Sequence, residues 1–162
     1  MTTVGNHEPS FSLRKATLED GEAIVDCLKA AFDPYRSEYT PDAFADTVLD
    51  SNTVKKRISD MCIFVAVSEG EIVGTIGCSA NGAEGHLRGM AVSPERQGSD
   101  IAAALLRAAE DELVEQGCQY VTLDTTEPLR RAIRFYQKHG FTATGRVSDF
   151  FGMNLYEYKK EL

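Results

Sequence analysis

Long hydrophobic runs are missing from this chain. No apolar stretch approaches the roughly 20 residues that a membrane-spanning helix needs. Residues 1–10 are polar and lack the apolar centre of a signal peptide. We therefore expect a cytoplasmic protein without a membrane partner.

Clusters of metal ligands are missing as well. The four cysteines form no C-x-x-C pair, and the three histidines are scattered along the sequence. A zinc site needs its ligands grouped, so we expect no metal cofactor. The cysteines, Cys27, Cys62, Cys78 and Cys118, are expected to be free thiols in a reducing compartment.

Positive charge is scarce. With 17 Lys and Arg against 25 Asp and Glu, the 162 residues carry a net charge of −8. Binding to nucleic acid needs a basic face, so we expect no nucleic-acid partner. The length suits one domain, and a hydrophobic content of 43% is typical of a globular chain. We expect a flexible tail at residues 1–10 and a single domain over residues 11–162.

Short strand-like runs alternate with helical patterns. Residues 61–67 and 72–78 are apolar and flank a turn that contains Gly70, which predicts a hairpin. Residues 101–116 repeat apolar positions four apart and end before Gly117, which predicts a helix. The other expected elements are strands at 11–14, 86–92, 120–125, 141–147 and 151–156 and helices near 20–33, 41–52, 52–59 and 129–138. This order predicts a mixed α/β domain around one sheet, with some parallel pairing in the second half.

The segment over residues 90–106 carries the first chemical signal. A strand runs through a short loop with Gly98 and Ser99 into a helix whose first turn is almost free of polar side chains. Such a helix start exposes unpaired N–H groups at the positive end of the helix dipole, where phosphate oxygens bind well. The alternative is an ordinary connection capped by Ser99 or Asp100. Neither a Walker A loop nor a G-x-G-x-x-G motif is present here.

A second segment favours the phosphate interpretation. Residues 132–141 read A-x-x-F-Y-x-K-x-G-F, and residues 92–106 read V-x-P-x-x-Q-G-x-x-I-A-x-x-L-L. Taken alone, Phe135 and Tyr136 would be core aromatics of an amphipathic helix. Together, in this order and spacing, the two motifs resemble the GNAT superfamily of acetyl-CoA-dependent N-acyltransferases. The resemblance covers about residues 11–158.

The resemblance implies a fold and an activity. The fold is a mixed, mostly antiparallel sheet of about seven strands with a splayed parallel pair, flanked by about four helices. The activity is transfer of an acetyl group from acetyl-CoA to a primary amine by direct attack, on a small-molecule or a peptide or protein acceptor. The alternative is a catalytically weak or inactive acyl-CoA-binding or sensor module with the same fold.

The resemblance also assigns coenzyme contacts. The main chain of the strand at 90–92 would pair with the pantetheine arm, and the loop at 97–102 would hold the pyrophosphate. The implied coenzyme-binding residues are Met90, Ala91, Val92, Gln97, Gly98, Ser99, Asp100, Ile101, Ala102, Ala132 and Phe135.

Asp100 departs from the family pattern, which has glycine at this position. As an N-cap, Asp100 would stabilise the helix, but its carboxylate would compete with phosphates for the same N–H groups. We expect coenzyme binding to be weakened and not abolished.

Three residues are candidates for proton transfer. Tyr136 matches the tyrosine that in many family members protonates the departing thiolate. Glu84 and His86 lie close to where the family often keeps its base or water relay, because the amine must lose a proton before it attacks. The alternatives are a packed helix tyrosine, a solvated charge in a Gly-rich turn for Glu84, and a surface residue for His86.

The acceptor site is less defined. Four acids at residues 38–50 could form a wall for a cationic acceptor or a solvated helix face: Glu38, Asp42, Asp46 and Asp50. Phe150, Phe151 and Tyr156 could line the acceptor pocket, form a homodimer contact or pack in the core.

Overall fold

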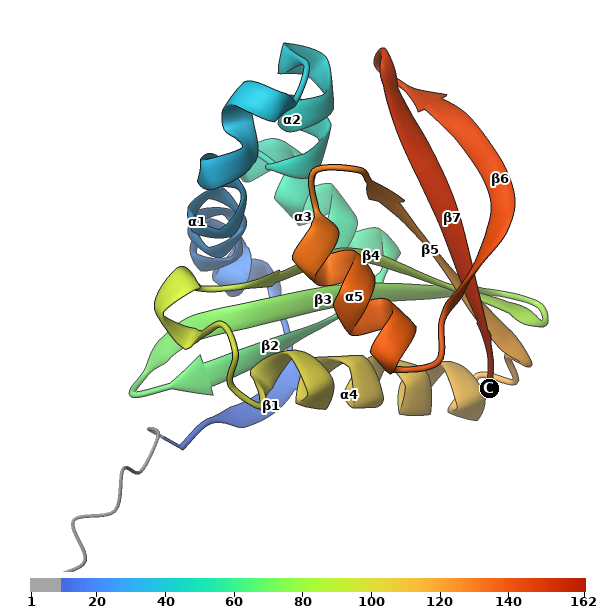
Figure 1. The fold of residues 1–162 in the computed structure, drawn as a ribbon. Helices are drawn as coiled ribbons and strands as arrows, with labels where there is room; N and C mark the ends of the chain where they lie inside the picture. The colour runs from blue at the N-terminus through green and yellow to red at the C-terminus, as the bar shows by residue number, and fades with distance from the viewer. Residues whose placement is uncertain (1–9) are drawn as a thin grey trace, which may run out of the picture.

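The computed structural model describes residues 10–162 (Figure 1). Apart from Ser10, the expected tail lies outside the described residues. The sheet is formed by β1 (Ser12–Lys15), β2 (Cys62–Ser68), β3 (Glu71–Asn81), β4 (Glu84–Val92), β5 (Tyr120–Thr126), β6 (Thr142–Phe150) and β7 (Met153–Glu161). The helices are α1 (Gly21–Phe32), α2 (Pro41–Thr47), α3 (Ser51–Asp60), α4 (Ile101–Glu115) and α5 (Arg130–Lys138). Three 3₁₀ segments are η1 (Leu18–Asp20), η2 (Asp33–Glu38) and η3 (Pro94–Arg96).

The seven strands form one sheet in the order β1-β2-β3-β4-β5-β7-β6. Every neighbouring pair is antiparallel except β4 and β5. The parallel pairing runs from Glu84–Tyr120 to Leu87–Leu123 and stops there, although both strands continue. The predicted fold class, including the splayed parallel pair, is therefore confirmed, and residues 10–162 contain five α-helices where about four helices were expected.

Helices cover both faces of the sheet, because side chains of a strand point alternately to its two faces. On β2, Ile63 and Val65 pack in a core with α1 and α3. Phe64 and Ala66 face the other way and pack in the core that contains α4 and the Tyr136 face of α5. The sheet is thus the middle layer between two helical layers (Figure 1).

The C-terminal hairpin differs from the prediction. We expected strands at 141–147 and 151–156, but β6 and β7 extend to Phe150 and Glu161. β6 is an edge strand that is exposed along nearly its whole length, so its sequence lacks the alternation that marks a half-buried strand. The β3–β4 hairpin is also longer than expected, and Glu84 lies in β4 and not in a turn.

The cysteines are free, and Cys27, Cys78 and Cys118 are buried. The expected free thiols agree with this arrangement, while the cytoplasmic location stays a prediction. Within residues 10–162, each helix is too short or too polar to cross a membrane. The same residues contain no group of three side chains arranged to hold a metal ion.

Candidate active site

A cleft of about 800 Å³ lies where β4 and β5 separate. One part of it, which we call the α4 end, is formed by residues 96–103 and by α5. The other part, the α3 end, is formed by side chains from α1, α2, α3 and β6. Because these two groups of helices cover opposite faces of the sheet, the cleft passes between β4 and β5 from one face to the other.

At the α4 end, several main-chain amides have no acceptor. Gly98 adopts a φ of +83°, which turns the chain from η3 into α4. Within residues 10–162, the N–H groups of Gly98, Asp100, Ala102 and Ala103 donate to no acceptor. Since they lie at the positive end of the helix dipole, they form a site suited to an anion.

Asp100 does not cap α4 as expected. Its backbone has φ −77° and ψ 0° instead of the extended conformation of a typical N-cap, and its carboxylate accepts no hydrogen bond from the helix start. The Ser99 hydroxyl accepts a long hydrogen bond of 3.5 Å from Ile101 N and donates to the carbonyl of Arg96. Asp100 is exposed, so the free amides stay available to a ligand.

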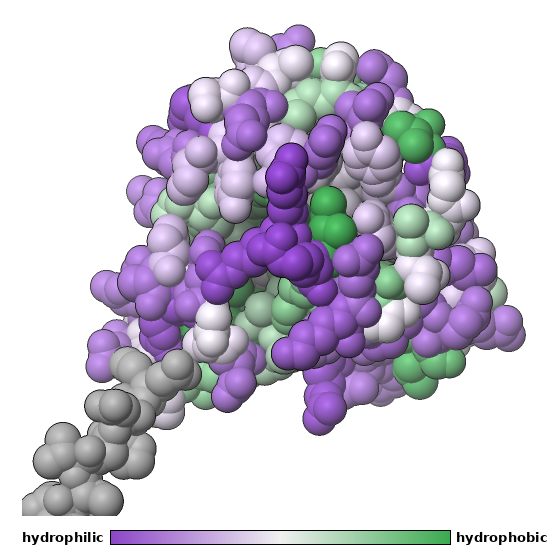
Figure 2. All heavy atoms as spheres, in the orientation of Figure 1, coloured by the Kyte–Doolittle hydropathy of each residue, from purple (hydrophilic) through white to green (hydrophobic). Residues whose placement is uncertain are grey.

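Basic side chains surround these amides, in spite of the acidic composition of the chain. Arg131 donates to Gln97 Oε1 at 3.5 Å, and Gln97 Nε2 donates to the carbonyl of Val92 at 3.1 Å. Arg96 and Lys138 line the same part of the cleft. Figure 2 shows strongly hydrophilic side chains gathered over α5, at the centre of this face. This local charge favours a polyanionic ligand.

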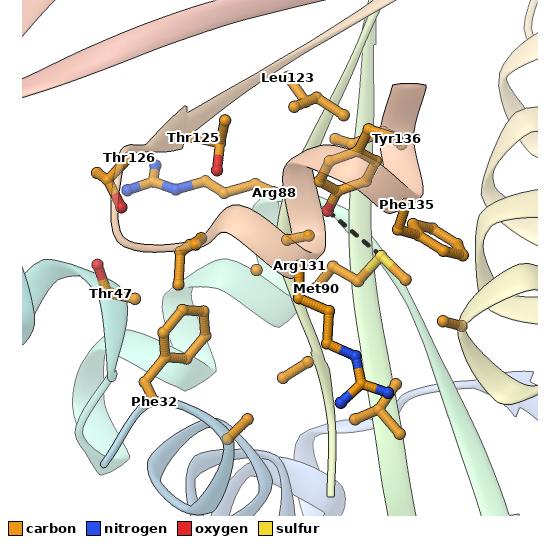
Figure 3. Close-up of a pocket in the computed structure, with 18 of the residues that line it drawn as sticks. Phe32, Thr47, Arg88, Met90, Leu123, Thr125, Thr126, Arg131, Phe135 and Tyr136 are labelled. Atoms are coloured by element: carbon orange, nitrogen blue, oxygen red, sulfur yellow. Dashed lines mark hydrogen bonds between the residues drawn. The ribbon is translucent and has the colours of Figure 1, made fainter. Parts of the chain in front are cut away.

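Tyr136 lines the cleft, and its hydroxyl points toward Met90 (Figure 3). Its hydroxyl donates to Met90 Sδ at 3.4 Å, and its ring packs edge-on against Phe135 and Phe141 with centroids 5.6 Å apart in each pair. Burial raises the pKa of Tyr136 above its usual value. The phenol is therefore protonated at neutral pH and can donate a proton.

β4 contains a bulge beside Tyr136. Its pairing with β3 shifts between Arg88 and Ala91, so that Gly89 and Met90 oppose a single residue of β3. Gly89 has a φ of +68°, and a Cβ there would lie 2.9 Å from Arg57 Nη1. The missing side chain thus lets the Arg57 guanidinium approach the strand directly.

The His86 side chain contacts the neighbouring strand β5. Its Nδ1 lies 2.9 Å from Thr122 Oγ1, and this hydroxyl donates to the Glu84 carboxylate at 3.0 Å. Because the hydroxyl proton is directed to Glu84, Nδ1 of His86 is the donor to Thr122. In the neutral ring, Nε2 then has a free lone pair. Nε2 lies 3.8 Å from Asp124 Oδ2.

The three proton-transfer candidates are therefore placed differently. Tyr136 and His86 line the cleft, whereas Glu84 does not and reaches it only through Thr122. Asp124 lines the cleft but was missed by the sequence analysis. Burial raises the pKa of Asp124, and a positive charge on His86 opposes this effect. An aspartate inside the apolar strand 120–126 is the signal that could have identified it.

Side chains from separate elements meet at the α3 end. Arg88 pairs with Asp46 at 2.9 Å, and Arg57 of α3 lies beside them. Of the four acids expected to form a wall, only Asp46 lines the cleft, and Asp50 caps α3 instead. Aromatic side chains complete this end: Phe32, Tyr35, Tyr39 and Phe150.

Comparison with known proteins identifies the family. The model of the acetyltransferase (GNAT) family matches residues 22–141. This chain belongs to the GNAT family. N-acetyltransferase 8B of Homo sapiens is 33% identical over 104 residues, which are 59% of this chain and 46% of that protein. An uncharacterised N-acetyltransferase of Methanocaldococcus jannaschii is 33% identical over 81 residues, 49% of this chain and 52% of that protein. The chain thus spans about half the length of the curated relatives that it matches.

Solved structures agree with the GNAT fold. The PaiA N-acetyltransferase of Thermoplasma acidophilum, solved in complex with coenzyme A, has a TM-score of 0.79 and 20% identity, covering 94% of this chain and 99% of that one. The ribosomal-protein-S18-alanine N-acetyltransferase of Escherichia coli has a TM-score of 0.76 and 16% identity, covering 94% of each chain. The predicted family is therefore confirmed, and membership supports acetyltransferase activity in general.

Proposed function

We propose that this GNAT protein transfers an acetyl group from acetyl-CoA to a primary amine by direct attack of the amine on the thioester. One observation carries the proposal: a single cleft through the sheet joins free amides at the start of α4, the Tyr136 hydroxyl and the Nε2 atom of His86. An anion site, an acid and a base therefore line the same cavity.

The α4 end fits coenzyme A. The free amides at the start of α4, those of Gly98, Asp100, Ala102 and Ala103, would bind the pyrophosphate, with Arg131 beside them. Among residues 10–162, no strand pairs with the β5 side of β4 beyond Leu87, so the backbone of Met90–Val92 can pair with the pantetheine arm as an added strand does. Ala132 and Phe135 line the adjacent wall. When bound, acetyl-CoA would supply the activated acetyl group.

His86 is the proposed base. An aliphatic amine with a pKa near ~10.4 is mostly protonated at neutral pH and must lose a proton to attack. Nε2 of His86 accepts that proton, directly or through a water, because Thr122 and Glu84 hold the opposite nitrogen as a donor. Asp124 lies beside the resulting imidazolium and stabilises it. Glu84 thus positions the base and is not the base itself.

Tyr136 is the proposed acid. As the new C–N bond forms and the C–S bond breaks, the sulfur takes the electron pair of the broken bond. The Tyr136 hydroxyl donates its proton to that sulfur, at the position where it now donates to Met90 Sδ. The ammonium loses two protons in all: His86 takes the first before the attack and releases it to solvent, and then takes the second from the nitrogen as the amide forms. The Tyr136 phenolate regains a proton from water, so the products are the amide, the free thiol and one released proton.

Thiol release from acetyl-CoA with a panel of polyamines, aminoglycosides, amino acids and peptides tests the proposal. Tyr136→Phe is expected to lower kcat at least tenfold without changing coenzyme affinity, which is measured by calorimetry. Tyr158→Phe is the matched control, because Tyr158 is equally buried but lies outside the cleft. Equal losses in both variants would contradict the role of Tyr136. Tight coenzyme binding without any turnover would support a binding module instead.

A further inference from the structure

The charges at the α3 end are not fully paired with one another. Asp46 and Arg88 form an ion pair at 2.9 Å and neutralise each other. Arg57 has no hydrogen bond or ion pair within residues 10–162, although Asp46 lies near it. Asp124 faces the same cleft, 3.8 Å from His86, and Arg146 beyond it is engaged by Glu157. One cationic and one anionic group therefore remain available to a ligand.

The partial burial of the Arg57 guanidinium is energetically unfavourable, and binding of an anionic ligand would offset this. Burial and the nearby charge of Arg88 lower the pKa of Arg57 to about 10. A half-buried guanidinium that makes no direct bond to a carboxylate is unfavourable, and a planar carboxylate is the partner that it binds best. Gly89 leaves the space in which Arg57 approaches β4. The charge thus lies beside Gly89, the residue that precedes Met90 in β4, and it lines the same cleft as His86 and Tyr136.

Arg57 and Asp124 match an acceptor that carries one negative and one positive charge. We propose that the acceptor is a free amino acid, whose carboxylate binds Arg57 and whose amine faces His86 and Asp124, an inference that rests on the proposed function. A protein N-terminus fits less well, because its amine is followed by a neutral amide in place of the carboxylate.

The lining of the α3 end indicates the type of amino acid. Aromatic and aliphatic side chains line this end, among them Phe32, Tyr35, Phe150 and Leu155, and Thr47, Thr125 and Thr126 line the cleft as well. Each of the first four is partly exposed, so apolar surface remains for a ligand to cover. An amino acid with an apolar side chain, such as leucine or phenylalanine, would bury that surface.

A carboxylate could also arrive on the acyl group, as in succinyl-CoA, and the experiment separates these two sources. Leucine and phenylalanine are compared with leucinamide and phenylalaninamide, each with acetyl-CoA, by kcat/KM from thiol release. The free acids are expected to be at least tenfold better than the amides. Equal values, or a preference for the amides, would overturn the proposal. Faster use of succinyl-CoA than of acetyl-CoA with leucinamide would overturn it as well.

Variants of α3 identify the residue responsible. Arg57→Gln is expected to lower kcat/KM for leucine by ten- to a hundredfold, mainly through KM, and to leave leucinamide within twofold. Arg57→Lys keeps the charge and retains part of the preference. Lys56→Gln is the matched control, since the Lys56 side chain is 77% exposed and pairs with Asp60 at the surface. An equal loss for leucine and leucinamide in Arg57→Gln would show a purely structural role.

Binding without turnover is also informative. In the protein saturated with coenzyme A, leucine is expected to raise the melting temperature, whereas leucinamide is not. No shift with leucine would overturn the amino-acid proposal. The proposed function is judged separately, by coenzyme binding and by Tyr136→Phe, so the two failures are distinguishable.

Discussion

The α4 end and the α3 end of the cleft are built in different ways. The α4 end uses main-chain amides from one short segment, residues 98–103, which a single helix start holds in place. The α3 end uses charged side chains that come from α2, α3, β4 and β5. A site made of amides tolerates many side-chain changes, whereas a site made of side chains changes with each substitution. The first therefore suits a constant ligand, and the second a specific one.

The largest expected effect tests the amide site. Ala103→Glu adds a carboxylate in the first turn of α4, where it is favourable for the helix but repels phosphates. At ~5 Å and an effective dielectric of ~20, the repulsion is roughly 3 kcal/mol, or on the order of 200-fold weaker coenzyme binding. Calorimetry with coenzyme A measures it. Ala103→Gln has a similar size and no charge, and a comparable loss in that variant would refute the electrostatic explanation.

A smaller effect, on kcat/KM, is expected from a substitution of Asp124, which faces the proposed base His86. Asp124→Asn removes the counter-charge of protonated His86 and should lower kcat/KM for the amine about tenfold at pH 7. The defect should shrink as the pH rises to 9, because more of the amine is then deprotonated without help. Coenzyme affinity should stay the same. A defect that is independent of pH would contradict the proton-transfer role.

A substitution of Asp100 is expected to strengthen coenzyme binding, in contrast to the losses expected above. Its carboxylate is exposed and makes no bond to the helix start, so its repulsion of phosphates is reduced by solvent. Asp100→Gly is expected to tighten coenzyme binding by a few-fold, less than tenfold. The dissociation constant measured at low and high salt checks this, with a smaller gain at high salt. Equal affinities of variant and parent would show that Asp100 does not weaken binding.

The smallest effect on ligand binding is expected from a change in the ion pair between Arg14 and Asp20, which do not line the cleft. Asp20 accepts two bonds from Arg14, at 2.7 and 2.8 Å, and one from Thr17 N, and the Arg14 guanidinium holds the pKa of Asp20 at about 2. Because this pKa is depressed, its stabilisation is present above the unfolded value near ~3.9 and is lost as the pH falls toward about 2.

Asp20→Asn should therefore lower the unfolding free energy by about 1 kcal/mol at pH 7 and by much less near the depressed pKa. Urea unfolding at the two pH values measures the difference. Both ends of the cleft should keep their ligand affinities, so a change in coenzyme or acceptor binding would show an unexpected coupling.

The two ends also differ in how far the sequence predicts them. The amide site could be predicted because its residues are contiguous and its pattern, Gln97-Gly98 before a helix, is local. Asp124 and Arg57 carry no such signal, since each becomes meaningful only when strand pairing and helix packing bring it to the cleft. Asp100 shows the opposite error: its residue type predicted a cap, but its backbone angles direct the carboxylate away. Residue type is a weaker guide than local backbone geometry at such a position.

The early end of pairing between β4 and β5, at Leu87 and Leu123, has a kinetic consequence. In the proposed reaction, an opening through the sheet would admit the two reactants from opposite sides, so that neither blocks the route of the other. Free coenzyme A would leave past α4 and α5, and the acetylated amine would leave past α1 and α3. Repeated cycles then need no large rearrangement of the chain.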